Sequence, residues 1–272
     1  MELSQIRLIE ELAANAWRPE VEQHLGGWRA RYSGGNSRRV NSVWPNAPLG
    51  AASLQEGVEW AEAFYDRRGV SPCFQLCPAA QPAELHQVLS ERGYRFYAHT
   101  QVQVQSIATL LGITAPSVER AIAADTLTDT WFELYTSASG YSAESLPVRR
   151  GILSRIGPAA HFVSLHHAGQ LSAVGLGVVE RGWLGVFCVV TSPISRQQGL
   201  ATGVMHALAE WGRQQNAEQI YLQVMEDNQP ALSLYSKLGF TRLYQYYYAV
   251  KDGKDEKAHG DRPVYRKVGR DG

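Results

Sequence analysis

The stretch FCVVTSPISRQQGLATGVMHALAEW, residues 187–211, decides the fold of this chain. Its first part is rich in β-branched and aromatic residues, which is typical of a strand that ends at Thr191. Pro193 then interrupts the run, and RQQGLA leads into apolar residues that recur at helical spacing to about residue 214. This order predicts a buried strand, a tight loop and a long helix.

The start of that helix is suited to bind an anion. A helix start leaves backbone N–H groups without partners and carries partial positive charge. Gly199 lets the backbone approach a bulky anion, and Arg196 adds a charge-assisted contact. The sequence therefore predicts a pyrophosphate cradle made by the amides of Gln198, Gly199, Leu200 and Ala201. Taken alone, the same residues also fit an ordinary strand-to-helix turn.

Two further segments follow. IYLQVMEDN (220–228) predicts a strand, and NQPALSLYSKLGF (228–240) predicts a helix that ends at Gly239. With the segment from Arg196 to Ala201, they resemble the GCN5-related N-acetyltransferase (GNAT) family, whose coenzyme A loop reads Gln or Arg, two residues, Gly, one residue, Gly or Ala. The full resemblance covers about residues 118–250. Neither the three-glycine nucleotide fingerprint nor a phosphate loop with GKS or GKT is present.

The resemblance implies an α/β (α+β) fold, with a mixed, mostly antiparallel sheet flanked by helices. The fourth and fifth strands, here 183–191 and 219–225, splay apart, and the pantetheine arm of acetyl-CoA lies in the gap. Backbone amides near the end of the fourth strand would orient the thioester carbonyl. The resemblance implies one acetyl-CoA per chain and no metal. The residues expected to bind acetyl-CoA are Val189, Val190, Thr191, Arg196, Gln197, Gln198, Gly199, Leu200, Ala201, Thr202, Asn228 and Tyr235.

Two residues of the last helix have roles that the resemblance implies. Tyr235 matches the tyrosine that protonates the leaving thiolate, which is plausible because a phenol has a pKa near 10 and a thiol near 8.5. Its ring also suits packing between helix and sheet. Asn228 matches a residue that holds coenzyme A, and it is equally an ordinary N-cap before Pro230.

The general base is the least determined part of the site. An amine must lose a proton before it attacks, and Glu226 lies at the end of the fifth strand, near the expected thioester. The alternative interpretation is that the Glu226 carboxylate is a solvated group in a loop and has no catalytic role. Other candidates, from segments that border the acceptor, are Glu133, Tyr141, Glu144 and His161, and an ordered water chain is a further alternative.

The first half contains a weaker copy of the same unit. Residues 53–68, 73–77 and 82–94 repeat the helix, strand and helix of the second half, but the segment NSVWPNAPLGAAS before residue 53 lacks the cofactor loop. Val88 or Leu89 stands where the tyrosine is expected. We therefore predict two GNAT-like domains, a degenerate one over 1–106 and an intact one over 107–250, with each domain built on its own sheet.

The remaining pattern predicts further elements. Helices are expected at 3–16, 127–139 and 143–156, and strands at 27–32, 38–44, 99–106, 161–167, 171–179 and 243–250. Residues 107–116 are interpreted as a linker between the halves. The tail 251–272 is charged and poor in apolar residues, so we expect disorder. Tyr246 and Tyr248 share a strand face and either border the acceptor site or pack against helices.

Composition excludes several classes. The chain has 272 residues with 26 Lys and Arg and 26 Asp and Glu, so its net charge of zero argues against a nucleic-acid binder or attraction to an anionic membrane. Three cysteines, Cys73, Cys77 and Cys188, make no disulfide scaffold. We expect reduced thiols in a cytoplasmic protein without a metal. The arginines at 29, 31, 38 and 39 are interpreted as a solvated strand edge.

These inferences predict an acetyl-CoA-dependent N-acetyltransferase that acts on a primary amine of a small molecule, an amino acid or a peptide by direct attack in a ternary complex. One alternative is a non-catalytic acyl-CoA sensor or partner-docking module. A second is a tandem enzyme of the aminoacyl-transferase or mycothiol-synthase kind. The acceptor, the acyl length and the choice between monomer and homodimer stay open.

Overall fold

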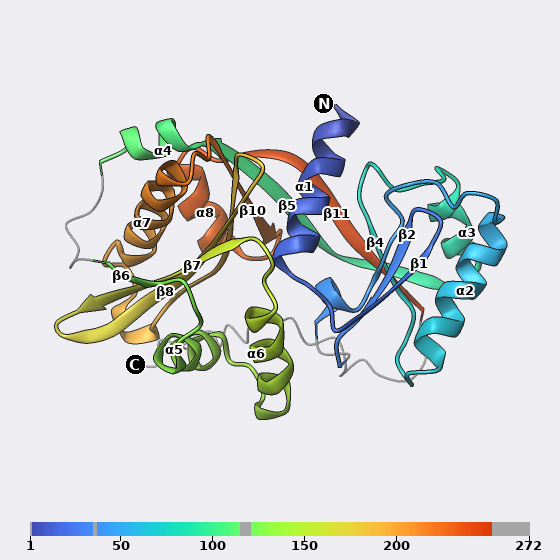
Figure 1. Ribbon diagram of the computed structural model, residues 1–272, viewed down its shortest axis with the longest axis horizontal. Helices are drawn as coiled ribbons and strands as arrows, with labels where there is room; N and C mark the ends of the chain where they lie inside the picture. The colour runs from blue at the N-terminus through green and yellow to red at the C-terminus, as the bar shows by residue number, and fades with distance from the viewer. Residues whose placement is uncertain (1, 35–36, 115–120, 252–272) are drawn as a thin grey trace, which may run out of the picture.

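The described strands form one continuous sheet. The computed structural model describes residues 2–34, 37–114 and 121–251. Its sheet has eleven strands in the order β1-β2-β3-β4-β11-β5-β10-β9-β8-β7-β6, and most neighbours run antiparallel. Two neighbouring pairs, β3 with β4 and β9 with β10, are parallel. Helices lie on the faces of the sheet and at its two ends (Figure 1). The predicted α/β fold class is confirmed, whereas the two expected sheets are joined into one.

The first half supplies the strands at one end and one long strand at the centre. Its elements are α1 (Leu3–Ala16), β1 (Val21–Leu25), β2 (Trp28–Tyr32), the 3-10 turn η1 (Arg38–Val40), β3 (Val43–Trp44), α2 (Leu54–Asp66), β4 (Cys73–Leu76), α3 (Leu85–Glu91) and β5 (Tyr94–Ser106).

The second half supplies the other end. Its elements are α4 (Ile107–Gly112), β6 (Ile122–Ala124), α5 (Asp129–Ser139), η2 (Ala143–Ser145), α6 (Leu146–Ser154), β7 (Ala159–His167), β8 (Gln170–Glu180), β9 (Trp183–Thr191), η3 (Pro193–Ser195), α7 (Leu200–Gln214), β10 (Gln219–Met225), α8 (Gln229–Lys237) and β11 (Thr241–Lys251).

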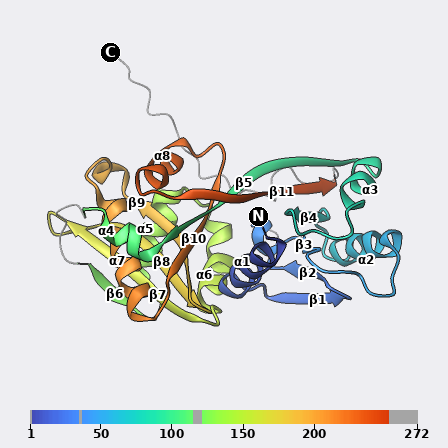
Figure 2. The ribbon, with the colours of Figure 1, turned by 90° about the horizontal axis from the view of Figure 1, so that it is seen from above.

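The halves are joined by two exchanged strands. β5 ends the first half but pairs with β10, and β11 ends the second half but pairs with β4. β5 and β11 also pair with each other along most of their length, from Thr241 opposite Val104 to Lys251 opposite Tyr94. The two strands span the molecule in opposite directions, β5 from the α3 end to the α8 end and β11 from the α8 end to the α3 end (Figure 2). The hydrogen bonds that hold the centre of the sheet therefore come from both halves.

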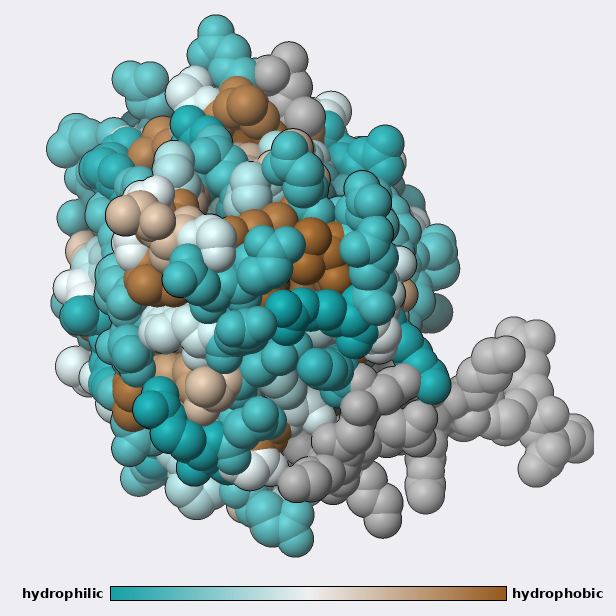
Figure 3. Space-filling model, turned by 90° about the vertical axis from the view of Figure 1, so that its right-hand side faces the viewer, coloured by the Kyte–Doolittle hydropathy of each residue, from teal (hydrophilic) through white to brown (hydrophobic). Residues whose placement is uncertain are grey.

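Side chains on the two faces of the sheet build separate cores. Successive residues of a strand point to opposite faces, so Val174 and Leu176 of β8 pack with α5 while Ala173 packs with α7. α7 lies very close to β8, because a Cβ on Gly175 would stand 2.3 Å from Val204 Cγ1. A third core lies under α2 and α3. The surface at that end is mostly hydrophilic, with small separate hydrophobic patches (Figure 3).

Most predicted elements are confirmed to within three residues at each end, and α1, β9 and β10 begin and end at the predicted residues. The linker over 107–116 is wrong for Ile107–Gly112, because these residues form α4 and bury Ile107 and Leu110 in the core under α7. The expected strand 38–44 is a 3-10 turn followed by the two-residue β3. β1 was not predicted, since four of its five residues are exposed and its pattern has no apolar period. The expected disordered tail lies, from residue 252 on, outside the described residues.

The expectation of solvated arginines in the first half is wrong for Arg31 and Arg38. Arg31 is fully buried, where its guanidinium donates to the carbonyl oxygens of Arg39 at 3.0 Å and Ala14 at 3.3 Å, and also to that of Trp17. It lies 4.4 Å from the ring centre of Trp44, and burial lowers its pKa to about 10. Backbone carbonyls thus replace the water that a strand edge would supply.

Candidate functional site

The site begins where β9 and β10 separate. These parallel strands pair only from Trp183 opposite Gln219 to Val186 opposite Leu222. Beyond that point each continues, β9 to Thr191 and β10 to Met225, without pairing to the other. Unpaired edges of this kind leave backbone N–H and C=O groups available to a third extended chain. β9 and β10 therefore correspond to the fourth and fifth strands that were expected to splay apart.

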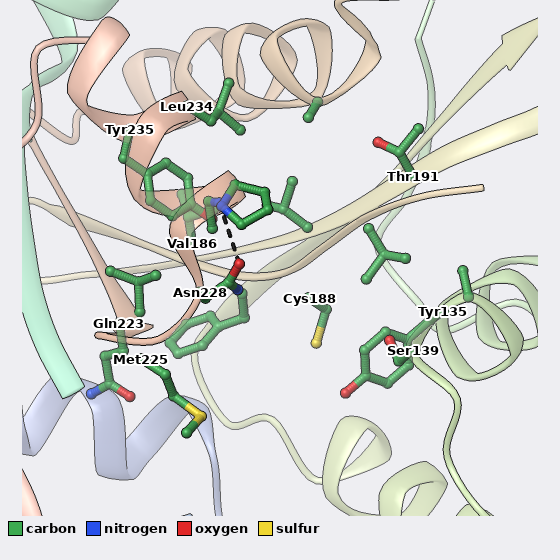
Figure 4. A pocket seen from close by; sticks show the side chains of 18 of the residues that line it. Tyr135, Ser139, Val186, Cys188, Thr191, Gln223, Met225, Asn228, Leu234 and Tyr235 are labelled. Atoms are coloured by element: carbon green, nitrogen blue, oxygen red, sulfur yellow. Dashed lines mark hydrogen bonds between the residues drawn. The ribbon is translucent and has the colours of Figure 1, made fainter. Parts of the chain in front are cut away.

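A bulge reshapes β9 at the point of separation. The register against β8 shifts between Val174, opposite Val190, and Leu176, opposite Phe187. Cys188, one of the two β9 residues opposite Gly175, has a left-handed φ of 54°, which is rare for a residue with a Cβ and occurs often at functional sites. The side chains of Cys188 and Tyr135 point into the same part of the cavity (Figure 4). Burial raises the pKa of the Cys188 thiol to about 11, so the thiol is neutral at physiological pH.

The loop after β9 exposes a helix start. Gln197 with φ 63° and Gly199 with φ 75° both have left-handed backbone conformations, and Gly199 is the N-cap of α7. No side chain caps this helix, and its first turn contains no acidic residue. The first backbone N–H groups of α7 therefore have no hydrogen-bond acceptor within the helix, and no carboxylate in the first turn neutralises the helix start.

α8 brings the predicted tyrosine and asparagine to the same place. The Asn228 side chain accepts a hydrogen bond from the Ala231 N–H at 3.3 Å and caps α8 (Figure 4, dashed line). Tyr235 is only 8% exposed, and its ring centre lies 5.8 Å from that of Phe240. Both expected structural roles, capping and packing, are thus present, and both residues also line a cavity.

A single cavity of about 830 Å³ connects these features. It is lined by eleven of the thirteen predicted site residues: Val189, Val190, Thr191, Arg196, Gln197, Gly199, Leu200, Ala201, Thr202, Asn228 and Tyr235. Gln198 and Glu226 are not among its described lining residues. The cavity therefore runs from the gap between β9 and β10 to the start of α7.

The candidate bases lie in different places. Glu226 is half-buried, and its backbone N–H donates to the His99 carbonyl at 3.0 Å. His161 stacks on Trp211 at 4.7 Å and contacts Asp125 at 3.0 Å. Of the remaining candidates only Tyr141 lines the cavity, whereas Glu133 and Glu144 do not.

The cavity also contains residues that sequence reasoning assigned no role in the site. Arg38 and Arg39 from η1, Trp17 after α1, and Arg149 from α6 line it. Tyr246 and Tyr248 line it too, so these two strand residues border the cavity. Which first-half residues line the cavity depends on the exchanged strands, which leave no pattern in the sequence.

Comparison with known proteins identifies the family. A family model described as "Probable histone acetyltransferase Rv0428c C-terminal" matches residues 3–249. The chain belongs to this acetyltransferase family. The uncharacterized N-acetyltransferase YobR of Bacillus subtilis (strain 168) is 28% identical over 257 residues, which are 92% of this chain and 100% of YobR.

Solved structures show the same fold. A GCN5-related N-acetyltransferase from Kribbella flavida has a TM-score of 0.66 at 17% identity, over 91% of this chain and 95% of that one. A tandem GNAT protein from the clavulanic acid biosynthesis pathway has a TM-score of 0.60 at 14% identity, over 91% and 89%. The protein is thus a GNAT-family acyltransferase, and the predicted family is confirmed.

Two features are absent from the described residues. None of the described helices is long and apolar enough to cross a membrane. Among residues 2–34, 37–114 and 121–251, no group of three or more His, Cys, Asp or Glu side chains is placed to hold a metal ion.

Proposed function

We propose that this protein is an acetyl-CoA-dependent N-acetyltransferase that transfers the acetyl group to a primary amine by direct attack in a ternary complex. One observation carries the proposal: a single cavity joins the splayed strands, the uncapped start of α7 and Tyr235. Acetyl-CoA needs a binding place for its phosphates and an extended channel for its arm, and this cavity contains residues suited to both.

The residues around α7 fit the phosphates of the cofactor. The left-handed backbone at Gln197 and Gly199 turns successive amides toward one side. We assign pyrophosphate binding to the amides from Gln198 to Thr202 and to the Arg196 guanidinium. The backbone groups of β9 from Val189 to Thr191 that face away from β8 would hold the pantetheine arm as an added strand and orient the thioester.

The catalytic roles follow from position. When bound, acetyl-CoA supplies an activated acyl group, and the protein contributes mostly by holding the amine against it. The Tyr235 hydroxyl is assigned to protonate the leaving sulfur, and Asn228 is assigned to contact the cofactor while it caps α8. Glu226 stays a prediction for the general base, with Tyr141, which lines the cavity, as the alternative.

We also retain the division into two GNAT-like units, 1–106 and 107–250, as a proposal. It is supported by the same order of helix, strand, helix and strand in α2-β4-α3-β5 and in α7-β10-α8-β11. In this proposal the second unit carries the cofactor residues, and the first contributes one wall of the acceptor site.

Calorimetric titration with acetyl-CoA tests the proposal. We expect saturable binding at one site per chain, abolished in an Arg196→Glu/Gly199→Asp double variant, followed by thiol release when amines are added. Binding without turnover of any amine would favour the alternative of an acyl-CoA sensor. Absence of binding to the intact protein would contradict both.

A further inference from the structure

The three cysteines of the chain differ in their surroundings. Cys73 and Cys77 are 0% and 7% exposed, lie in β4 and directly after it, and are absent from the described lining of the cavity. Cys188 is partly exposed and lines the cavity, at the bulge where β9 leaves β10. Among the three thiols, the Cys188 thiol is therefore the one that a ligand in the cavity can reach.

A buried hydroxyl without a partner faces the same place. Ser139 of α5 is 7% exposed, it lines the cavity, and its side chain has no hydrogen-bond partner among the described residues. Ser139 follows Tyr135 by four residues, so both side chains lie on one face of α5. Figure 4 shows them on the same side of the cavity as Cys188. Because buried polar groups normally have a hydrogen-bond partner, Ser139 indicates a ligand with a polar atom beside Cys188.

The proposed position of acetyl-CoA brings its sulfur to this thiol. Two cations, Arg196 before α7 and Lys237 at the end of α8, line the cavity on the side assigned to the cofactor. From the phosphates at the start of α7, the arm would run back along β9 from Thr191 toward the bulge at Cys188. The thioester at the end of this arm would thus meet the Cys188 thiol.

We propose that Cys188 is a modification site: in the absence of an acceptor amine, its thiol takes the acetyl group from bound acetyl-CoA. The Cys188 sulfur bonds to the acetyl carbonyl carbon, the bond from that carbon to the coenzyme A sulfur breaks, and the thiol proton passes to the leaving thiolate. Ser139 would donate to the carbonyl oxygen while negative charge develops on it. The inference rests on the proposed acetyl-CoA site and goes beyond the proposed reaction.

The modification would make activity respond to the state of the coenzyme A pool. One thioester is broken and another is formed, so the exchange is reversible, and the acetylated fraction follows the ratio of acetyl-CoA to free coenzyme A. An acetyl group on Cys188 would occupy the part of the cavity beside Tyr135 and Ser139 and hinder entry of the acceptor. Turnover would therefore slow until coenzyme A removes the acetyl group.

Position, and not an activated thiol, accounts for the exchange. Burial raises the pKa of Cys188 to about 11, although a hydrogen bond from Tyr135 and the charges of Arg39 and Arg149 act in the opposite direction. Because the thiolate is the nucleophile, reagents in solution should react slowly with Cys188. A thioester held beside the sulfur has an effective concentration of about 10⁵–10⁸ M, which offsets the roughly 10⁴-fold excess of thiol over thiolate at pH 7.

The mass of the intact protein, followed by peptide mapping, tests the proposal. Incubation of the full chain with acetyl-CoA and no amine should add one acetyl group, located on Cys188 and removed by excess coenzyme A. The rate should saturate with acetyl-CoA. It should exceed by about a hundredfold or more the rate with S-acetylpantetheine, which carries the same thioester without the nucleotide. Cys73 and Cys77 are internal controls and should stay unmodified.

Variants assign the residues. Cys188→Ala should still bind acetyl-CoA in calorimetry but gain no acetyl group. Ser139→Ala should slow the acetylation by about tenfold to a hundredfold, as for a lost donor to a developing oxyanion. Ser137→Ala is the matched control, because Ser137 is exposed on the same helix, hydrogen-bonds the Glu133 carbonyl at 2.6 Å and is absent from the described lining. Equal rates in the two serine variants would overturn the role of Ser139.

The outcomes separate this proposal from the proposed function. An acetyl group on Cys188 that saturates with acetyl-CoA and is lost in the Arg196→Glu/Gly199→Asp variant supports it. Three results overturn it while the acetyltransferase proposal stands: bound acetyl-CoA without an adduct, acetylation of Cys73 or Cys77 as readily as Cys188, and equal rates with the two thioesters. Absence of acetyl-CoA binding to the intact protein contradicts the proposed function and this proposal with it.

Discussion

The starts of α7 and α2 occupy equivalent places in the two halves but differ in their chemistry. α2 begins at Ser53, whose side chain accepts from the Glu56 N–H at 3.3 Å, while the Glu56 carboxylate accepts from the Ser53 N–H at 2.7 Å. α7 begins at Gly199, without a capping side chain and without an acid in its first turn. The N-cap side chain of α2 accepts from an amide of that helix, whereas no side chain caps the first amides of α7.

Under the proposed function, this difference separates a binding half from a structural half. In α2 the capping box supplies both the acceptor and the negative charge that a helix start favours. Hydrogen bonds from Ser53, the backbone one first, lower the pKa of Glu56, so its carboxylate remains ionised there. An anionic cofactor would have to displace that carboxylate. The first half lacks the cofactor loop and has a capping box at the start of α2. Both features disfavour binding of an anionic cofactor there.

The largest expected effect concerns the tyrosine, for which the first half has no counterpart. Tyr235→Phe keeps the ring that packs on Phe240 but removes the hydroxyl. If this hydroxyl protonates the leaving thiolate, kcat should fall by about 10²- to 10⁴-fold, the usual contribution of a general acid. Acetyl-CoA affinity, measured by calorimetry, should change little.

Tyr247→Phe is the control for that variant, because Tyr247 also lies partly buried but outside the described lining of the cavity. Its kcat should equal that of the unchanged protein. A Tyr235→Phe enzyme with full activity would show that Tyr235 only packs, as Leu89 does in the first half.

A proline substitution tests the free amides directly. Ala201→Pro removes one N–H from the first turn of α7, where the helix itself does not need that donor. This protein already accepts proline at the same position of α6 and α8. We expect acetyl-CoA affinity to fall by about tenfold to a hundredfold, as for one lost hydrogen bond to a charged group.

Gln55→Pro makes the same change at the start of α2 and provides the matched control. It should leave acetyl-CoA affinity unchanged. Equal losses in the two variants would mean that the substitution acts through the fold, and no loss in Ala201→Pro would remove this amide from the cofactor site.

Sequence reasoning succeeded where the information is local. The period of α7, the glycine at its start and the asparagine before α8 are fixed by neighbouring residues, and all three lie where predicted. It failed where the determinant is a distant contact. α4 is a helix because Ile107 and Leu110 are buried under α7, and the buried Arg38 faces aromatic rings from β5 and β11.

The exchanged strands explain why one part of the cavity lining was less predictable than the residues from Arg196 to Tyr235. Residues from Arg196 to Tyr235 are close in sequence, so a motif can represent their arrangement. The rest of the cavity lining combines Arg38 and Trp17 of the first half with Arg149 of the second. No spacing in the sequence encodes such a combination, because it depends on how β5 and β11 cross.

A pH-dependent stability test examines the junction between the halves. Glu10 of α1 is 1% exposed, and its carboxylate accepts from Gln75 of β4 at 2.9 Å and from Tyr244 of β11 at 2.6 Å. Burial raises the pKa of Glu10 above its ordinary value of 4.5, although these hydrogen bonds act in the opposite direction. The folded state therefore binds the proton more tightly than the unfolded state does.

It follows that the contribution of Glu10 to the free energy of unfolding is fully present below about pH 4.5 and is lost as the pH rises through the raised pKa. Urea unfolding at a series of pH values should show this decline, and Glu10→Gln should flatten it. Glu11→Gln is the control, since Glu11 is 51% exposed on the same helix. Parallel profiles for all three proteins would contradict a raised pKa at Glu10.

The smallest effect returns to the start of α2. Ser53→Ala removes the capping hydroxyl and should lower the free energy of unfolding by about 1 kcal/mol. It also makes α2 resemble α7 in lacking a side-chain cap. Even so, acetyl-CoA should still bind at one site per chain, because Ser53 has an extended backbone with a φ of −70°, unlike the left-handed Gly199, and Glu56 remains in the first turn. A second binding site in Ser53→Ala, seen by calorimetry, would show that the cap alone separates the binding half from the structural half. A stoichiometry of one would assign that difference to the left-handed loop and the cations as well.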